Sequence, residues 1–297
     1  MRVVAWGHTD PGRKRDQNQD NYLIDDDLRL YIVADGMGGH QGGETASRMA
    51  VDVVTSEVAD SVSDLAAAAK RLRADRRARL LRTTQPMDAI DGMDTPVDDS
   101  GDDSKTDPMI EHVIAPASMV MREAAREAGQ RIFDAALEDP ALRGMGTTLT
   151  AMLYARGRVH LAHAGDSRAY LFRDNRLEQL TDDHSWIAEQ IRAGTMTEAE
   201  AKESKFRHII TRSVGFERDV EVDHVGIPVE AGDCFLLCSD GMTNYVENDE
   251  LETILQRTWH RRAPRRLIDL ANERGGDDNI TVVVVCVANH TVESDDS

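Results

Sequence analysis

Aromatic residues, cysteine and positive charge are all scarce in this 297-residue chain. Phe, Trp and Tyr make up 4% of the residues, so aliphatic side chains have to supply most of the core. The 35 basic residues are outnumbered by 54 acidic ones, which gives a net charge of −19. A chain this acidic lacks the basic surface that nucleic acid and anionic membranes require. No apolar run reaches the length of a membrane span, and the N-terminus has no apolar signal core. We therefore expect a cytoplasmic protein that binds neither nucleic acid nor membrane.

Three cysteines are too few for a fold built on disulfides. Cys234 and Cys238 stand four residues apart in an apolar run, which places them on one face of an expected strand. Cys286 lies in a valine-rich run, and the spacing of the three matches no zinc pattern. We expect three buried, reduced thiols.

The chain is nevertheless long enough for a large core, with 40% hydrophobic residues. Strand-like runs and helical patterns alternate in clusters joined by short turns, which indicates an α+β fold with antiparallel sheets. We expect strands at 3–6, 21–24, 28–34, 149–154, 159–164, 168–172, 177–180, 220–227, 234–238 and 279–287, and helices at 44–58, 117–137, 251–259 and 262–272, with a polar, mostly helical stretch at 183–207.

Residues 62–115 differ in composition from the rest. Ala66–Arg82 is a helical pattern with a net charge of +6, and Thr84–Pro108 follows with a net charge of −7 and three prolines. The acidic stretch has little to bury, so we expect a mobile insertion. It is either a solvated insertion with no specific role or an electrostatic latch against the basic helix.

Five aspartates stand out because of where they fall. Four lie at the ends of apolar strands beside Gly or Asn, and a fifth precedes an expected strand: Asp35, Asp166, Asp240 and Asp278, and Asp20. Carboxylates that converge at strand ends repel one another unless cations neutralise them. Oxygen ligands suit hard divalent ions such as Mg²⁺ or Mn²⁺ better than zinc. The glycine after Asp35 also permits a close approach of its own carbonyl.

The motifs around these aspartates follow the order of a known family. They are Arg15–Asp20 (RDQNQD), Asp35–Gly39 (DGMGG), Met145–Thr148 (MGTT), Gly165–Arg168 (GDSR), Thr181–His184 (TDDH), Ser239–Gly241 (SDG) and Asp278–Thr281 (DNIT). With these motifs the chain resembles the bacterial metal-dependent Ser/Thr protein phosphatases of type 2C, the PPM family.

The resemblance implies a fold, a reaction and partners. The fold is a central sandwich of two antiparallel β-sheets flanked by helices, in α-β-β-α layers. It forms one catalytic domain over residues 1–288, with the insertion at 62–115, a flap at 182–215 beside the active site and a short acidic tail at 289–297. The reaction is hydrolysis of phosphoserine and phosphothreonine in proteins by a hydroxide that bridges two Mn²⁺ or Mg²⁺ ions, without a phosphoenzyme. The implied protein is a monomer whose substrates include a eukaryotic-like Ser/Thr kinase.

The resemblance also assigns roles to residues. Asp35 would bridge two metals, the Gly36 carbonyl would bind the second, and Asp240 and Asp278 would complete the shell of the first. Asp166 would hold a third, weaker metal together with Asp240. The remaining roles fall to Arg15, which would bind the substrate phosphate, Asp20, which would order metal-bound waters, and Asn279, which would support the site through hydrogen bonds.

Two positions depart from the eukaryotic members of the family. Gln19 stands where they often carry Glu, and Met37 stands where they place a His that is often proposed as general acid. Both changes are familiar in bacterial members, and they leave the proton donor for the leaving group unassigned. Two other functions stay open: a catalytically silent phosphoprotein-binding or kinase-scaffolding module, and a phosphatase that acts on an anti-sigma antagonist.

Overall fold

A computed structural model describes residues 1–83, 117–206, 208–258 and 260–288. The chain divides into two compact units, one of residues 1–58 and 117–297 and the other of residues 59–116. The acidic stretch 84–108 and the tail 289–297 lie outside the described residues, and so do both alternatives for the insertion, a solvated segment or an electrostatic latch. Within the described residues, no helix is long and apolar enough to cross a membrane.

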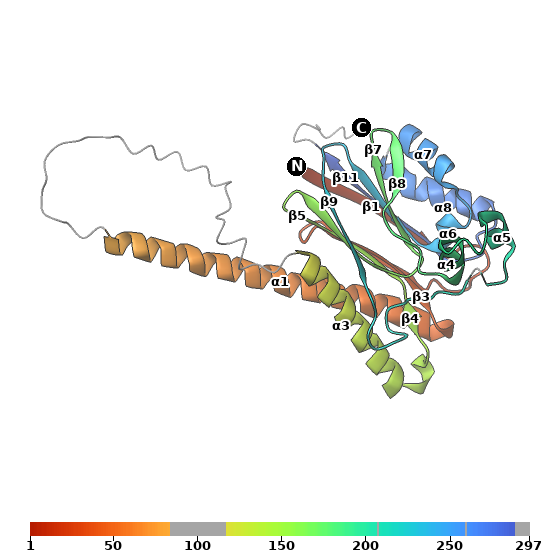
Figure 1. Cartoon of the computed structure of the whole chain (residues 1–297), viewed down its shortest axis with the longest axis horizontal. Helices are drawn as coiled ribbons and strands as arrows, with labels where there is room; N and C mark the ends of the chain where they lie inside the picture. The colour runs from red at the N-terminus through yellow and green to blue at the C-terminus, as the bar shows by residue number, and fades with distance from the viewer. Residues whose placement is uncertain (84–116, 207, 259, 289–297) are drawn as a thin grey trace, which may run out of the picture. The chain divides into compact units, whose positions relative to one another are not determined.

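Two antiparallel sheets form the centre of the first unit (Figure 1). The first sheet runs in the order β1 (Arg2–Asp10), β11 (Ile280–Ala288), β10 (Cys234–Cys238), β7 (Arg168–Arg173) and β8 (Arg176–Gln179). The second runs in the order β2 (Asp20–Asp25), β3 (Leu30–Met37), β5 (Leu149–Ala155), β6 (Arg158–Ala164) and β9 (Asp223–Pro228), and the short β4 (Gly146–Thr147) pairs with β3.

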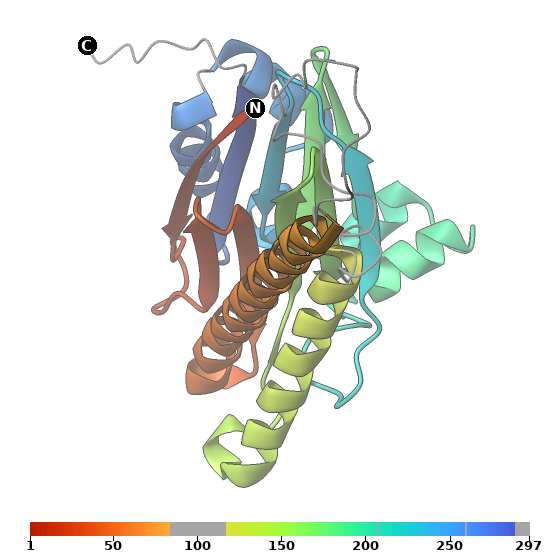
Figure 2. The ribbon, with the colours of Figure 1, turned by 90° about the vertical axis from the view of Figure 1, so that its left-hand side faces the viewer.

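Helices cover the outer face of each sheet (Figures 1 and 2). The second sheet packs against the beginning of α1 (Gly39–Thr83) and against α3 (Ala117–Glu138). The first sheet packs against α6 (Asp240–Thr243), α7 (Asn248–Arg257) and α8 (Ala263–Glu273). A third apolar cluster, with Tyr31, Phe235 and Val283 among its members, fills the space between the sheets. The α-β-β-α sandwich of antiparallel sheets expected from the resemblance is therefore confirmed.

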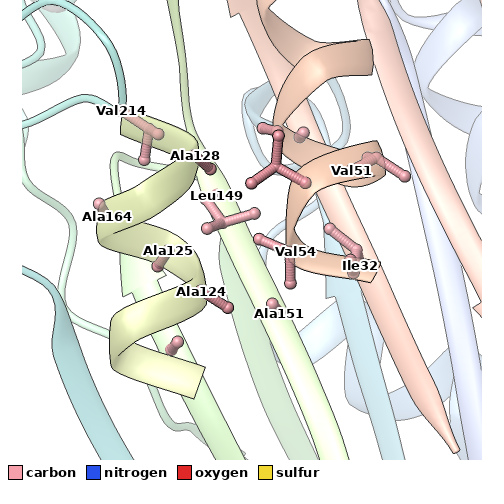
Figure 3. Packing of buried hydrophobic residues seen from close by; sticks show 14 of the residues in the cluster. Ile32, Val51, Val54, Ala124, Ala125, Ala128, Leu149, Ala151, Ala164 and Val214 are labelled. Carbon is pink, nitrogen blue, oxygen red and sulfur yellow. The ribbon is translucent and has the colours of Figure 1, made fainter. Parts of the chain in front are cut away.

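Small side chains let α3 approach its sheet closely. Ala124, Ala125 and Ala128 of α3 are all buried, and Figure 3 shows Ala124 and Ala128 near Leu149 and Ala151 of β5. These alanines form the packing stripe of the helix. Aliphatic side chains supply most of this cluster, as the scarcity of aromatic residues led us to expect.

Several elements differ in extent from the prediction. The first helix begins at Gly39 instead of residue 44, because the glycine-rich segment forms its first turn. The stretch at 183–207 contains two short helices, α4 (Trp186–Arg192) and α5 (Glu198–Glu203), and Gly194 between them has a positive φ of 70°. α6 and β4 were not predicted, since four and two residues are too short for a periodic signal.

The expectation of three reduced thiols is wrong for two of the cysteines. Cys234 and Cys286 are direct partners on β10 and β11 and form a disulfide, whereas Cys238 is free and buried. The two cysteines are 52 residues apart, and only the register of the two strands places them opposite each other. Cys234 and Cys238 do share the face that packs against the helices, as predicted.

Candidate active site

Five predicted aspartates meet at one end of the sandwich. Asp20 begins β2 and is the direct partner of Asp35 on β3. Asp240 begins α6 directly after β10, and Asp278 lies just before β11. Asp166 lies in the turn between β6 and β7. The alternation of strand direction brings these segments, far apart in sequence, to the same edge.

A pocket of about 960 Å³ opens at this edge. Four of the aspartates line it, together with Arg15, Gly36 and Asn279: they are Asp35, Asp166, Asp240 and Asp278. Asp20 is not among the lining residues and is buried. Seven of the eight predicted site residues therefore border one cavity, and the eighth lies behind it.

Burial and mutual repulsion raise the pKa values of four of the carboxyl groups. Burial raises the pKa of Asp20 to about 7, against the hydrogen bonds from two hydroxyls. Burial, followed by repulsion from Asp240, raises the pKa of Asp166 to about 8. The pKa of Asp35 lies well above its ordinary value through burial and repulsion from four other aspartates, and the pKa of Asp240 is raised by burial and by Asp278. Burial and repulsion thus outweigh the positive charges near these groups.

The oxygen atoms of this cluster fit divalent cations. One carboxylate oxygen in each of three aspartates is buried and has no hydrogen-bond partner in the described part of the chain: Asp20 Oδ1, Asp166 Oδ1 and Asp240 Oδ1. Buried polar atoms are normally paired, so an unpartnered set points to a missing ligand. Clustered carboxylate oxygens match Mg²⁺ or Mn²⁺.

Gly36 allows β3 and the first turn of α1 to lie in contact. A Cβ on Gly36 would collide with the carbonyl oxygens of Gly43 and Gln19. The Gly36 amide donates a hydrogen bond to the Gln19 carbonyl at 3.2 Å. Any larger residue here would push apart the strand that carries Asp35 and the segment that precedes Asp20.

Asp20 is held by two hydroxyls, one from β11 of the other sheet and one from the residue that follows β10. Ser239 Oγ donates to Asp20 Oδ2 at 2.8 Å, and Thr281 Oγ1 donates to the same oxygen at 2.7 Å. Both residues lie in the family motifs, but the resemblance assigned them no role. Their closeness in sequence to predicted metal ligands could have indicated a role, since Ser239 precedes Asp240 and Thr281 is three residues after Asp278. Only the packing of the two sheets shows that both hydroxyls reach Asp20.

Asn279 connects the start of β11 to the loop that carries Arg15. Its side-chain NH₂ donates to the carbonyls of Pro11 and Gln17 at 3.0 and 2.9 Å. Its Oδ1 accepts from the Gln19 amide at 2.7 Å. Three hydrogen bonds thus tie both ends of this loop to the residue that follows Asp278.

Arg15 pairs with a carboxylate of the cluster itself. Its Nη2 donates to Asp278 Oδ2 at 2.7 Å, and its side chain is 53% exposed. Among the described residues, Arg15 forms no ion pair with Asp16 or Asp20. Lys14 beside it pairs with Asp277, so two positively charged side chains, Lys14 and Arg15, border the pocket on this side.

A network of polar side chains fixes the turn that carries Asp166. Thr148 Oγ1 accepts a hydrogen bond from the Asp35 amide at 2.9 Å and is paired with Ser167 Oγ at 2.7 Å. The Gly165 amide donates to His184 Nδ1 at 3.1 Å. Because Nδ1 accepts, Nε2 carries the proton and donates to Asp223 Oδ2 at 3.0 Å. This network was not predicted from the sequence, because its members come from five separate segments.

The expected flap lies beside the pocket. Residues 208–213, at its end, line the cavity. Arg168 anchors its beginning through a two-pronged pair with Asp183 at 2.8 and 2.6 Å, and Arg212 anchors its end through Asp223 at 3.0 Å. Between these anchors, Ser185 and Thr197 cap α4 and α5.

Comparison with known proteins identifies the family. Residues 12–273 match the family model described as Protein phosphatase 2C. The serine/threonine phosphatase stp of Listeria welshimeri is 34% identical over 282 residues, which cover 93% of both chains. The crystal structure of the Mycobacterium tuberculosis serine/threonine phosphatase PstP/Ppp superposes with a TM-score of 0.74 at 29% identity, over 97% of this chain and 99% of that one.

A further structure of that type carries metal. The catalytic domain of the protein phosphatase PstP, in complex with two manganese ions, superposes with a TM-score of 0.70 at 30% identity, over 97% of this chain and 99% of that one. The family model, the relatives and the solved structures agree over nearly the whole chain. The protein therefore belongs to the type 2C, or PPM, family of metal-dependent Ser/Thr protein phosphatases.

Proposed function

We propose that this protein hydrolyses phosphoserine and phosphothreonine in proteins at the pocket described above, with Mn²⁺ or Mg²⁺ held by its carboxylates. The observation that carries the proposal is the set of unpartnered, buried carboxylate oxygens that converge beside Arg15. Asp35, the Gly36 carbonyl, Asp240 and Asp278 would hold two ions, and Asp166 with Asp240 would hold a third. Bound cations of this kind activate water as a nucleophile and offset the charge on the phosphoryl oxygens.

The residues of the chain supply binding and orientation. Arg15 carries a planar guanidinium that can hold two phosphate oxygens at once, and its half-exposed position lets it reach a substrate in the pocket. Pairing with Asp278 keeps this side chain at the pocket when no phosphate is bound. Asp20 keeps one oxygen fixed by Ser239 and Thr281 and directs the other into the cluster, where it would order water.

The flap would select among protein substrates. Its end lines the pocket, and it is anchored at both ends while the two helices between lie over the surface. A eukaryotic-like Ser/Thr kinase is the substrate that we propose first.

Met37 lines the pocket and has no proton to donate, so the proton for the leaving oxygen would come from water.

The proposal is tested with a phosphopeptide, with Mn²⁺ present, and the variant Asp240→Asn. An amide is a weaker, uncharged ligand, so metal-dependent turnover should fall by about a hundredfold to a thousandfold, which is the scale of losing a major electrostatic contributor. Asp174→Asn is the matched control, since Asp174 has a positive φ of 52° that asparagine also tolerates and it lies in the turn between β7 and β8.

Retained activity in Asp240→Asn would refute the site assignment. A wild-type sample that binds the phosphopeptide but does not hydrolyse it would favour the silent binding module. A sample that hydrolyses only an anti-sigma antagonist would favour the narrower enzyme.

A further inference from the structure

Cys234, Cys286 and His260 form a cluster far from the carboxylates. The two cysteines are partners on β10 and β11. His260 begins η2 (His260–Arg262), the turn between α7 and α8, and a ring nitrogen of His260 and the two Sγ atoms lie within 4.8 Å of one another. Cys234 begins β10 and Asp240 follows its end, so about 20 Å of strand separates the two sites.

This cluster is enclosed and incompletely satisfied. Cys234 is 3% exposed and Cys286 is 9% exposed, among apolar side chains of the first sheet and its helices. His260 is partly buried beside the ring of Phe172, and its Nε2 is buried without a hydrogen-bond partner among the described residues. A buried nitrogen without a partner costs free energy unless a ligand uses it.

We propose that the reduced Cys234–Cys286 pair, together with His260, binds one zinc ion. Two thiolates and one imidazole are the ligands that select zinc over Mg²⁺ and Mn²⁺. The two thiolate charges cancel the charge of the ion, so the complex is neutral and suits its apolar surroundings. Water would complete the four-ligand shell on the side of His260, which is only partly buried.

The disulfide and the zinc site exclude each other. Thiolates, and not disulfide sulfurs, are metal ligands. A dithiol reductant transfers two electrons and two protons to the pair, breaks the S–S bond and becomes a disulfide itself. Zinc binding then displaces the two thiol protons. In the reverse direction a small-molecule disulfide accepts two electrons from the thiolates, and the zinc ion leaves as the S–S bond forms.

The site would join three elements of the first sheet's outer face. The ligands come from β10, β11 and the turn between α7 and α8, so bound zinc would tie the helical layer to the sheet. Because the three ligands are assembled only in the folded chain, zinc would raise the stability of the reduced protein. The catalytic pocket lies at the other end of the strands, so turnover of phosphopeptide should not depend on this ion.

Cobalt(II) is the probe for the test. The full-length protein is reduced with a phosphine, desalted and titrated with Co²⁺ in excess Mg²⁺, which occupies the carboxylate site. We expect one equivalent to produce a thiolate-to-cobalt charge-transfer band in the near ultraviolet, which carboxylate ligands do not give. One equivalent of zinc should bleach the band, and the oxidised protein should show none.

Variants identify the ligands. Cys234→Ser and Cys286→Ser should each remove most of the charge-transfer intensity, and His260→Ala should weaken cobalt binding by about tenfold or more. Cys238→Ala is the matched control and should keep both the band and the affinity, and circular dichroism checks that each variant is folded. Absence of the band in the reduced wild type, or cobalt binding in folded His260→Ala as tight as in wild type, would overturn the proposal.

Discussion

At the scale of single residues, the site depends on how each carboxylate is paired. Asp20 accepts hydrogen bonds from two hydroxyls at one oxygen and from no described group at the other. Asp278 forms an ion pair with Arg15. A fixed oxygen orients the side chain, and an unpartnered oxygen is left to act in the site. The hydroxyl donors come from β11 of the other sheet and from the residue that follows β10, so the position of Asp20 reports on the packing of the whole sandwich.

Thr281→Val should impair the site without changing the shape of the side chain. Asp20 Oδ2 would lose one of its two hydrogen-bond donors, and a lost hydrogen bond to a buried acceptor costs about 1–3 kcal/mol. We expect a lower free energy of unfolding in urea and weaker Mn²⁺ binding by calorimetry. Thr281→Ser keeps the hydroxyl and is the control. Equal Mn²⁺ affinity in the Val and Ser variants would show that this donor does not matter.

Arg15→Lys should lower kcat/KM for a phosphopeptide about as much as Arg15→Ala does. Lysine keeps the charge but loses the planar pair of donors that holds two phosphate oxygens. The loss should appear mainly in KM, and the concentration of Mn²⁺ at half-maximal activity should change little. Full activity in the Lys variant would mean that charge alone is needed, as in a surface ion pair.

At the scale of elements, the strand ends and the loop of residues 11–19 form one structure. Asn279 makes the connection through hydrogen bonds to Pro11, Gln17 and Gln19. Gly241 permits the same approach from α6, since a Cβ there would collide with the Asn279 carbonyl. The loop that carries Arg15 is therefore positioned by the start of β11.

Asn279→Ala should release this loop and so act on Arg15 from a distance. Three hydrogen bonds would be lost, at about 1 kcal/mol each, so the free energy of unfolding should fall by about 3 kcal/mol. Hydrogen exchange should rise at the amides of residues 12–19. Asn279→Asp keeps only the acceptor for the Gln19 amide and sets a carboxylate oxygen against the Pro11 and Gln17 carbonyls, so it should release the loop as well. Unchanged exchange in the Ala variant would contradict the connection.

At the scale of the whole molecule, the net charge of −19 is partly concentrated at one edge of the sandwich. The pKa values of Asp20 and Asp166 are about 7 and about 8 in the folded chain, against an ordinary value of 3.8. At pH values between the ordinary pKa of 3.8 and the raised pKa values of about 7 and about 8, the folded state binds more protons than the unfolded state. The folded protein without metal therefore loses stability as pH rises through this window.

In EDTA, the free energy of unfolding should fall as pH rises from about 5 to about 8, by up to about 1.4 kcal/mol per pH unit for each proton. Mg²⁺ or Mn²⁺ should remove this dependence, because cations favour the charged carboxylates. Urea unfolding at a series of pH values measures both curves. Asp20→Asn should flatten the EDTA curve, and a wild-type stability that is level or rising over this range would contradict the predicted repulsion.

The sequence by itself determined the fold class, the strand-end aspartates and the family, because periodicity and short motifs are local properties of the chain. Only the tertiary structure decided which groups meet. The disulfide of Cys234 and Cys286, the pairing of Arg15 with Asp278 and the hydroxyls on Asp20 join residues 52 to 263 positions apart. Such contacts depend on strand register and on how the two sheets face each other. A shift of one residue in register would move every side chain of a strand to the opposite face, and no local pattern contains that information.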